Sequence, residues 1–112
     1  MSHNVFEEMA KRYDSESRIE LANIVAKEVK KELQNSKAKT LIDYGSGTGL
    51  VSLQLADMVE SVLLIDSSKQ MIEVAAGKIA NNNIANAAVR HSDFTEETLA
   101  VKADIILVSL VL

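Results

Sequence analysis

Three glycines at alternate positions, Gly45, Gly47 and Gly49, constrain this chain more than any other feature of its sequence. They follow a short apolar segment at residues 40–42 and precede a stretch of helical periodicity at residues 50–58. Glycine adopts left-handed backbone angles at little cost and leaves the main chain bare for close contact with a ligand. The sequence therefore predicts a strand, a tight turn and a helix whose positive N-terminal end faces a bound ligand. A tight turn without a ligand is the alternative interpretation.

Strand and helix patterns alternate beyond this turn. Apolar runs at residues 62–65, 87–89 and 104–108 predict three further strands, residues 68–81 predict a helix, and residues 96–99 predict a short one. This alternation predicts an α/β fold, a Rossmann-like parallel sheet with helices on both faces. Because the second and fourth strands are continuously apolar, we expect both to be buried on both faces.

The first third of the chain is helical in pattern. Phe6, Met9 and Tyr13 share one helix face, and a second periodic run covers residues 19–33. A chain of 112 residues buries enough surface for one core. We therefore expect a single domain at 1–112, with an N-terminal helical segment at 1–36 and an α/β core at 37–112.

The composition argues against several classes of function. Without cysteine there are no disulfides, thiolate metal sites or cysteine nucleophiles. His3 and His91 lack ligand-like spacing, so no metal site is expected. A net charge of -4 without a basic cluster argues against nucleic acid as a partner. Since the sequence carries neither a signal-peptide pattern nor an apolar run long enough to span a bilayer, we expect a soluble, cytoplasmic protein without membrane contact.

Acidic side chains stand where parallel sheets bind their ligands, at the carboxyl ends of strands. A carboxylate at Asp43, before the glycine turn, would repel a pyrophosphate and favour a positively charged ligand. Asp66 ends the second strand and can accept hydrogen bonds from both hydroxyls of a ribose, although it can also cap the next helix. Met71, one turn into that helix, can pack on an adenine ring or belong to the core.

Two further candidate positions follow the third and fourth strands. Asp93, followed by Phe94, can accept a hydrogen bond from an adenine amino group or cap a helix. Ser109 lies where the reactive end of the ligand is expected, although it can also be part of the strand core. A dinucleotide fingerprint needs a small residue at the sixth position of its glycine motif, where this chain has Leu50. Together with Asp43, Leu50 argues against NAD.

This combination of motifs resembles the class I S-adenosylmethionine-dependent methyltransferases over most of the chain, from about Tyr13 onward. In that family an acidic residue precedes a G-x-G-x-G turn, as Asp43 does here, and another ends the second strand and binds ribose, as at Asp66. A tyrosine like Tyr13 often closes over the cofactor, and an acidic residue like Asp104 precedes the fourth strand. The expected cofactor-binding residues are Tyr13, Asp43, Gly45, Ser46, Gly47, Gly49, Asp66, Ser67, Met71, Asp93, Phe94 and Ser109.

The resemblance implies S-adenosyl-L-methionine as cofactor and S-adenosyl-L-homocysteine as product. The implied reaction is an in-line methyl transfer to nitrogen, oxygen or carbon, in which the protein mainly aligns donor and acceptor. The lack of a basic patch favours a small-molecule acceptor over nucleic acid. No catalytic residue is predicted. The alternatives are a non-catalytic or truncated cofactor-binding or interaction module and an NAD-dependent oxidoreductase.

The last predicted strand is followed by no further element. Members of the family usually have seven strands, against about four here, so we expect the chain to be the N-terminal, cofactor-binding part of a domain truncated at its C-terminus. An apolar strand at an open sheet edge otherwise favours pairing with another chain. Self-association through this strand is the alternative expectation.

Overall fold

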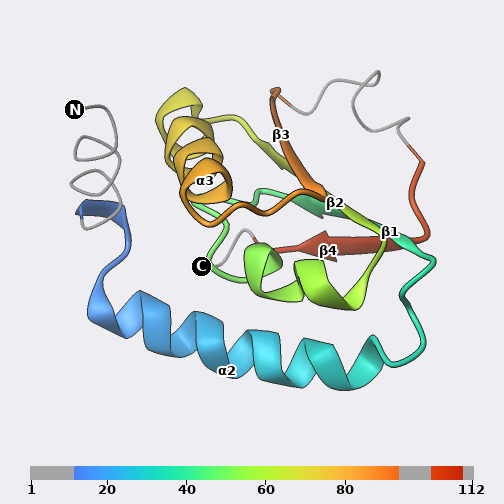
Figure 1. Cartoon of the computed structure of the whole chain (residues 1–112). Helices are drawn as coiled ribbons and strands as arrows, with labels where there is room; N and C mark the ends of the chain where they lie inside the picture. The colour runs from blue at the N-terminus through green and yellow to red at the C-terminus, as the bar shows by residue number, and fades with distance from the viewer. Residues whose placement is uncertain (1–11, 94–101, 110–112) are drawn as a thin grey trace.

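The computed structural model describes residues 12–93 and 102–109. Their strands form a parallel four-stranded sheet in the order β3-β2-β1-β4 (Figure 1). The strands are β1 (Thr40–Tyr44), β2 (Ser61–Asp66), β3 (Ala87–His91) and β4 (Ile105–Val108). The helical elements are α2 (Glu16–Glu32), the 3₁₀ helix η1 (Ser52–Met58) and α3 (Lys69–Asn81). The predicted α/β fold with a Rossmann-like parallel sheet is confirmed.

The first strand occupies the centre of this sheet, between β2 and β4. Tyr44, the last residue of β1, lies opposite Ile65 of β2 on one side and Val108 of β4 on the other. The segments that follow these three strands therefore leave the sheet at the same edge. This register brings the glycine turn, the start of α3 and the end of β4 together.

The described helices pack on one face of the sheet, so helices on both faces, as predicted, are not found within residues 12–93 and 102–109. The main core cluster joins Ala22 and Ala26 of α2, Leu55 of η1 and Ala75 of α3 with strand residues such as Leu64. Figure 1 shows α2 along one side of the molecule, with η1 between it and the sheet. A second cluster on the other face is formed by Ile42, Tyr44 and Ile65, with Leu63 and Ala103 packed against them.

Both long helices begin at serine N-caps. The Ser15 side chain accepts a hydrogen bond from the backbone N–H of Arg18 at the start of α2, and Ser68 does the same for Met71 at the start of α3. Such caps satisfy N–H groups that have no partner within the helix. The helix predicted at residues 68–81 is therefore confirmed, with Ser68 as its cap. Tyr13 precedes α2 in a short helical turn.

The segment after the glycine turn differs from the prediction. Residues 50–58 were expected to form a helix with an exposed positive end, but the structure has a seven-residue 3₁₀ helix, Ser52–Met58, without a side-chain cap. A 3₁₀ run of this length is uncommon, and this one contacts both α2 and β2. The segment is therefore helical as predicted, but it is a 3₁₀ helix that begins at Ser52. The expectation that its N-terminal end faces a bound ligand stays a prediction.

The fourth strand is also less buried than its apolar sequence predicts. Ile105 and Leu107 pack against the main core, but Ile106 and Val108 are 60% and 57% exposed. Within the described residues β4 pairs with β1 alone, so the expectation that both its faces are buried is wrong there. The same expectation holds for β2, where Val62, Leu64 and Ile65 are buried. Self-association through β4 stays a prediction, and the short helix predicted at 96–99 lies outside the described residues.

Candidate functional site

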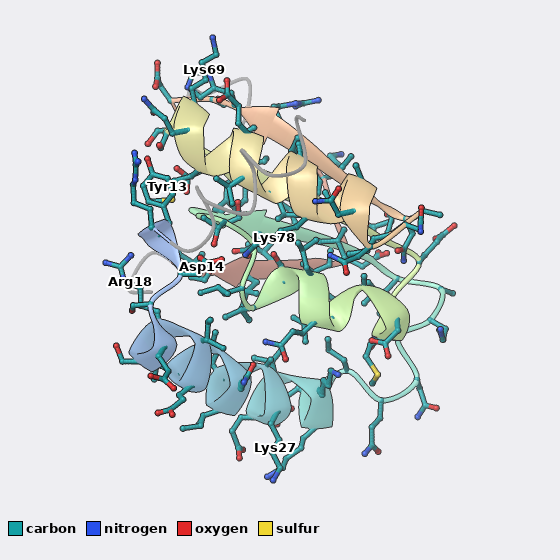
Figure 2. The ribbon with its side chains drawn as sticks, turned by 60° about the vertical axis from the view of Figure 1, so that its left-hand side comes forward. Tyr13, Asp14, Arg18, Lys27, Lys69 and Lys78 are labelled. Atoms are coloured by element: carbon teal, nitrogen blue, oxygen red, sulfur yellow. The ribbon has the colours of Figure 1, made fainter. Side chains whose placement is uncertain are left out.

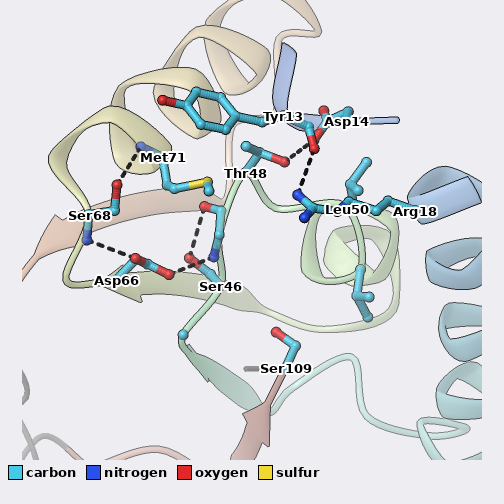
Figure 3. Close-up of a pocket in the computed structure, with 13 residues that line it drawn as sticks. Tyr13, Asp14, Arg18, Ser46, Thr48, Leu50, Asp66, Ser68, Met71 and Ser109 are labelled. Carbon is cyan, nitrogen blue, oxygen red and sulfur yellow. Dashed lines mark hydrogen bonds between the residues drawn. The ribbon is translucent and has the colours of Figure 1, made fainter. Parts of the chain in front are cut away.

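A cavity of about 190 Å³ lies at the carboxyl ends of β1, β2 and β4 (Figure 3). Small-molecule sites usually enclose roughly 300–1,000 Å³, so the described residues form part of the wall of such a site. The lining residues are Tyr13, Asp14, Arg18, Gly45, Ser46, Gly47, Thr48, Leu50, Val51, Asp66, Ser68, Met71 and Ser109. The structure thus brings together the predicted residues Tyr13, Gly45, Ser46, Gly47, Asp66, Met71 and Ser109.

The glycines of the turn serve two different purposes. All three have positive φ, 71° at Gly45, 59° at Gly47 and 82° at Gly49. A Cβ atom at Gly49 would lie 2.9 Å from the side chains of Leu53 and Leu64, whereas a Cβ at Gly47 would meet nothing within 4 Å. Gly49 is therefore required for packing, and it does not line the cavity. Gly47 presents open main chain to the cavity, as expected for a residue beside a ligand.

The backbone N–H groups of the turn already have protein acceptors. Those of Gly45 and Ser46 donate to Ile65 O at 2.8 and 3.1 Å, and that of Gly49 donates to Ser46 O at 3.0 Å. The N–H of Gly47 donates to Asp66 Oδ2 at 2.8 Å. These bonds hold the turn against the end of β2. They leave few main-chain donors for a ligand, in contrast to a phosphate-binding loop.

Asp66 fastens the glycine turn to the start of α3. Its Oδ2 accepts from Gly47 N, and its Oδ1 accepts from Ser68 N at 2.8 Å. The cap of α3 is Ser68, so the alternative role of Asp66 as a helix cap is replaced by a bridging role. Each carboxylate oxygen has a second lone pair, and Asp66 therefore keeps acceptor capacity on the cavity wall.

Asp43 lies behind the cavity wall rather than on it. Its side chain is completely buried, and its Oδ1 accepts a hydrogen bond from Ser109 Oγ at 2.7 Å. Burial raises the pKa of Asp43 from 3.8 to about 6, against the opposing effect of the Ser109 and Ser52 hydroxyls. Within the described residues, Asp43 Oδ2 and Ser52 Oγ are buried without a hydrogen bond of ordinary geometry. Ser109, which lines the cavity, connects this carboxyl group to it.

Tyr13 and Met71 supply apolar surface to the cavity. Figure 3 shows the Tyr13 ring and the Met71 side chain on the same side of it, beside the start of α3. The backbone carbonyl of Tyr13 accepts a hydrogen bond from Arg18 Nη1 at 3.0 Å. An aromatic ring and a thioether are suitable neighbours for a flat heterocycle.

Sequence reasoning missed four polar residues of this wall, Asp14, Arg18, Thr48 and Ser68. Thr48 Oγ1 donates to Asp14 Oδ1, and Lys78 Nζ of α3 forms an ion pair with Asp14 Oδ2. Arg18 stands on the exposed side of α2, where sequence alone marks an ordinary charged residue. Asp14 directly follows Tyr13, which the sequence did indicate. Lys78 carried no signal, because its partners lie 30 or more residues away in the sequence.

The predicted residues Ser67 and Asp93 do not line the cavity. Both are exposed, and Phe94 lies outside the described residues. The end of β3 is nevertheless connected to this region, because His91 Nε2 lies 2.9 Å from Ser67 O and Ser92 N donates to Asp66 O at 3.0 Å. Their contact with a cofactor stays a prediction.

Asp104 lies at the opposite end of the sheet, before β4. Its Oδ2 accepts from Thr40 N at 2.9 Å, and its own N–H donates to Thr40 Oγ1 at 3.2 Å. This reciprocal pair ties the start of β4 to the start of β1. The acidic residue that precedes the fourth strand is thus a structural residue, far from the cavity.

In residues 12–93 and 102–109, no group of three or more histidine, cysteine or acidic side chains is placed to hold a metal ion. In the same ranges, no helix has the length and apolar character needed to cross a membrane.

Together the cavity offers an open main-chain approach at Gly47, a carboxylate with free acceptor capacity at Asp66 and apolar surface at Met71 and Tyr13. This set fits a ligand with vicinal hydroxyls and a flat ring. Within the described residues, the buried Oδ2 of Asp43 has no hydrogen bond of ordinary geometry and is a further acceptor behind Ser109. The residues present therefore fit a nucleoside carrying a positive charge at its other end.

Comparison with known proteins agrees with this fit. A sequence family described as methyltransferase domain matches residues 35–112. A SAM-dependent methyltransferase from Aquifex aeolicus is 28% identical, with a TM-score of 0.61, over 79% of this chain and 47% of its own.

Two other solved structures share the fold at lower identity. A coclaurine N-methyltransferase bound to N-methylheliamine and SAH is 24% identical, with a TM-score of 0.70, over 85% of this chain and 29% of its own. A putative RNA methyltransferase from Pyrococcus horikoshii is 17% identical, with a TM-score of 0.66, over 87% and 46%. The chain therefore spans less than half of each of these three proteins.

Proposed function

Since this chain belongs to the methyltransferase domain family, we propose that it binds S-adenosyl-L-methionine and serves an S-adenosylmethionine-dependent methyl transfer. The observation that carries the proposal is the position of Asp66. Its carboxylate lies on the cavity wall and connects the glycine turn to α3. Residues 1–112 are proposed as one cofactor-binding domain, with an N-terminal helical segment at 1–36 and an α/β core at 37–112. Tyr13, Asp14 and Arg18 of the helical segment line the cavity.

Each part of the cavity suits one part of the proposed cofactor. Asp66 would accept hydrogen bonds from the ribose hydroxyls, and Met71 would lie against the adenine. Asp43, acting through Ser109, would favour the positively charged amino-acid end, since an ionised carboxylate attracts ammonium and sulfonium groups. Tyr13 would exclude water from one side. The cofactor, once bound, supplies a methyl group that is already activated for transfer.

The acceptor is proposed to be a small molecule, and the protein to act in the cytoplasm. The support is the net charge of -4 without a basic cluster, which is unfavourable for nucleic acid. Among the similar structures, one is an N-methyltransferase with bound N-methylheliamine and another is a putative RNA methyltransferase. The absence of cysteine suits a reducing compartment.

Isothermal titration with S-adenosylmethionine, S-adenosylhomocysteine and NAD tests the proposal. We expect binding of the first two, and a loss of about ten-fold or more in affinity for Asp66→Ala, because hydrogen bonds to a charged group are lost. Asp57→Ala, a change at an exposed carboxylate of η1, is the matched control and should bind like the unmodified chain. Binding of NAD without either S-adenosyl compound would contradict the proposal.

A further inference from the structure

We propose that Lys78, a residue outside every sequence motif described above, is a positioning residue for the cofactor site. This inference rests on the proposed function. Lys78 lies on α3 and does not line the cavity. It acts through Asp14 and Thr48, which do line it.

The three side chains come from three separate parts of the chain. Asp14 precedes α2, Thr48 stands in the glycine turn, and Lys78 belongs to the last turn of α3. Lys78 Nζ is paired with Asp14 Oδ2 and donates to Thr48 Oγ1 at 3.2 Å, while Thr48 Oγ1 donates to Asp14 Oδ1. Figure 2 shows Asp14 and Lys78 close together between α3 and the start of α2. We call these three residues the Asp14 cluster.

Burial makes the charge of Lys78 essential to the cluster. The side chain of Asp14 is only 7% exposed and that of Lys78 is 22% exposed. A buried carboxylate is strongly unfavourable without a partner, so removal of one member of such a pair leaves a large penalty on the other. In the described residues, Lys78 is the cation that meets Asp14. Without it, the least costly response is movement of Asp14 towards solvent.

Such a movement would open the cavity, because Asp14 directly follows Tyr13. The Tyr13 ring forms one side of the cavity beside Met71 (Figure 3). Thr48 lies between Gly47 and Gly49, which both have positive φ, so the contacts of its side chain help to hold the turn in this conformation. One ammonium group thus fixes both an aromatic wall and the glycine turn.

A second ion pair of the chain, between Glu28 and Lys31, provides a control for Lys78. The Glu28–Lys31 pair on α2 is an exposed ion pair, with both side chains more than 60% exposed, and neither residue lines the cavity. Pairs of that kind contribute little to stability. Lys31→Met is therefore the matched control for Lys78→Met.

The first test measures S-adenosylhomocysteine affinity by titration. We expect Lys78→Met to weaken binding by about ten-fold or more, because the buried carboxylate loses its partner and the wall opens. Lys78→Arg should stay within about three-fold of the unmodified chain, since the charge is kept. Lys31→Met should bind unchanged. Unchanged affinity of folded Lys78→Met, or an equal loss in Lys78→Arg and Lys78→Met, would overturn the proposal.

A second measurement needs no ligand and separates this inference from the proposed function. The chain has no tryptophan, so Tyr13→Trp creates a single reporter at the cavity wall. Acrylamide should quench this reporter about two-fold more efficiently or better when Lys78→Met is added, because residue 13 becomes accessible to solvent. Equal quenching overturns the positioning role even if S-adenosylhomocysteine binds. Increased quenching supports it even if the chain binds no S-adenosyl compound.

Lys78→Met can also fail to fold, because it leaves a charge buried. Asp14→Asn combined with Lys78→Met removes both charges and keeps the side-chain sizes similar, and this pair should fold. Its affinity should fall by no more than that of Asp14→Asn alone, since the two residues act through one contact. Affinity losses that multiply in the double variant would contradict a shared role.

Discussion

The backbone N–H of Gly47 donates to Asp66 Oδ2 at 2.8 Å, and this bond joins the glycine turn to the end of β2. Gly47 and Asp66 are the two residues that the sequence assigned most directly to the ligand. In the structure these two residues are hydrogen-bonded to each other. The same carboxylate that would receive a ribose also keeps the turn in its shape, so ligand affinity and local stability depend on one side chain.

Replacing Asp66 should therefore destabilise the fold as well as the site. Asp66→Ala leaves the N–H groups of Gly47 and Ser68 without their acceptor, and a buried donor without a partner costs about 1–3 kcal/mol. Asp66→Asn should lose less, because an amide oxygen still accepts one of the two bonds. The free energy of unfolding in urea measures both. Equal stability of Asp66→Ala and the Asp57→Ala control would contradict the bridging role.

The stability of the chain should depend on pH through Asp43. Its pKa in the folded chain is raised to about 6 from 3.8, mainly by burial, so the folded state binds more protons than the unfolded state between these values. The contribution of Asp43 to the free energy of unfolding is therefore largest below pH 3.8 and falls as the pH rises to about 6. The shift corresponds to about 3 kcal/mol.

The variant Asp43→Asn should remove this dependence. Its unfolding free energy should change less between pH 4 and about 6 than that of the unmodified chain, because the amide does not titrate. Urea unfolding at several pH values across this window provides the comparison. Curves of the same slope for both proteins would show that other groups control the pH dependence.

Ser109 should keep the pKa of Asp43 from rising further. Ser109→Ala removes the hydrogen bond to Oδ1 at 2.7 Å, which favours the ionised form. The pH window in which stability falls should then extend above about 6, with a loss of about 1–3 kcal/mol at neutral pH. Carboxyl titration by NMR, with isotope-labelled aspartate, reports the pKa directly. An unchanged or lowered pKa of Asp43 would contradict the role of the Ser109 hydrogen bond in holding that pKa down.

The glycines of the turn should respond differently to alanine. Gly49→Ala combines a φ of 82° with a Cβ only 2.9 Å from Leu53 and Leu64, and should cost about 2–4 kcal/mol of stability. Gly47→Ala has a φ of 59° but open space, and should cost about 1–2 kcal/mol. Thermal unfolding ranks the two.

The affinity for S-adenosylhomocysteine should rank Gly47→Ala and Gly49→Ala in the opposite order. Gly47→Ala places a methyl group on the cavity side of the turn and should weaken S-adenosylhomocysteine binding more than its stability loss implies. Gly49 does not line the cavity, so a folded Gly49→Ala protein should retain much of its affinity. Greater loss of affinity at Gly49 would mean that the turn as a whole, rather than Gly47, determines binding.

Much of the fold was predictable from local pattern. The apolar segments of β1, β2 and β3 and the helical periodicity of α2 and α3 each appear within one short stretch, and the structure places an element at each. The 3₁₀ form of η1 was not predictable, because the periodicity of residues 50–58 does not distinguish it from an α-helix. The exposure of Ile106 and Val108 likewise depends on which strand pairs with β4, and no local pattern records that.

The candidate site likewise has features that the sequence predicts and features that depend on the tertiary structure. The sequence by itself determined the glycine turn and the acidic residues at the strand ends, because φ preferences and strand boundaries are local properties. Only the tertiary structure decided that Asp43 lies behind the cavity, that Asp66 is bonded to Gly47, and that Lys78 meets Asp14. These contacts join residues far apart in the chain, and chain folding sets their distances while burial sets their strength.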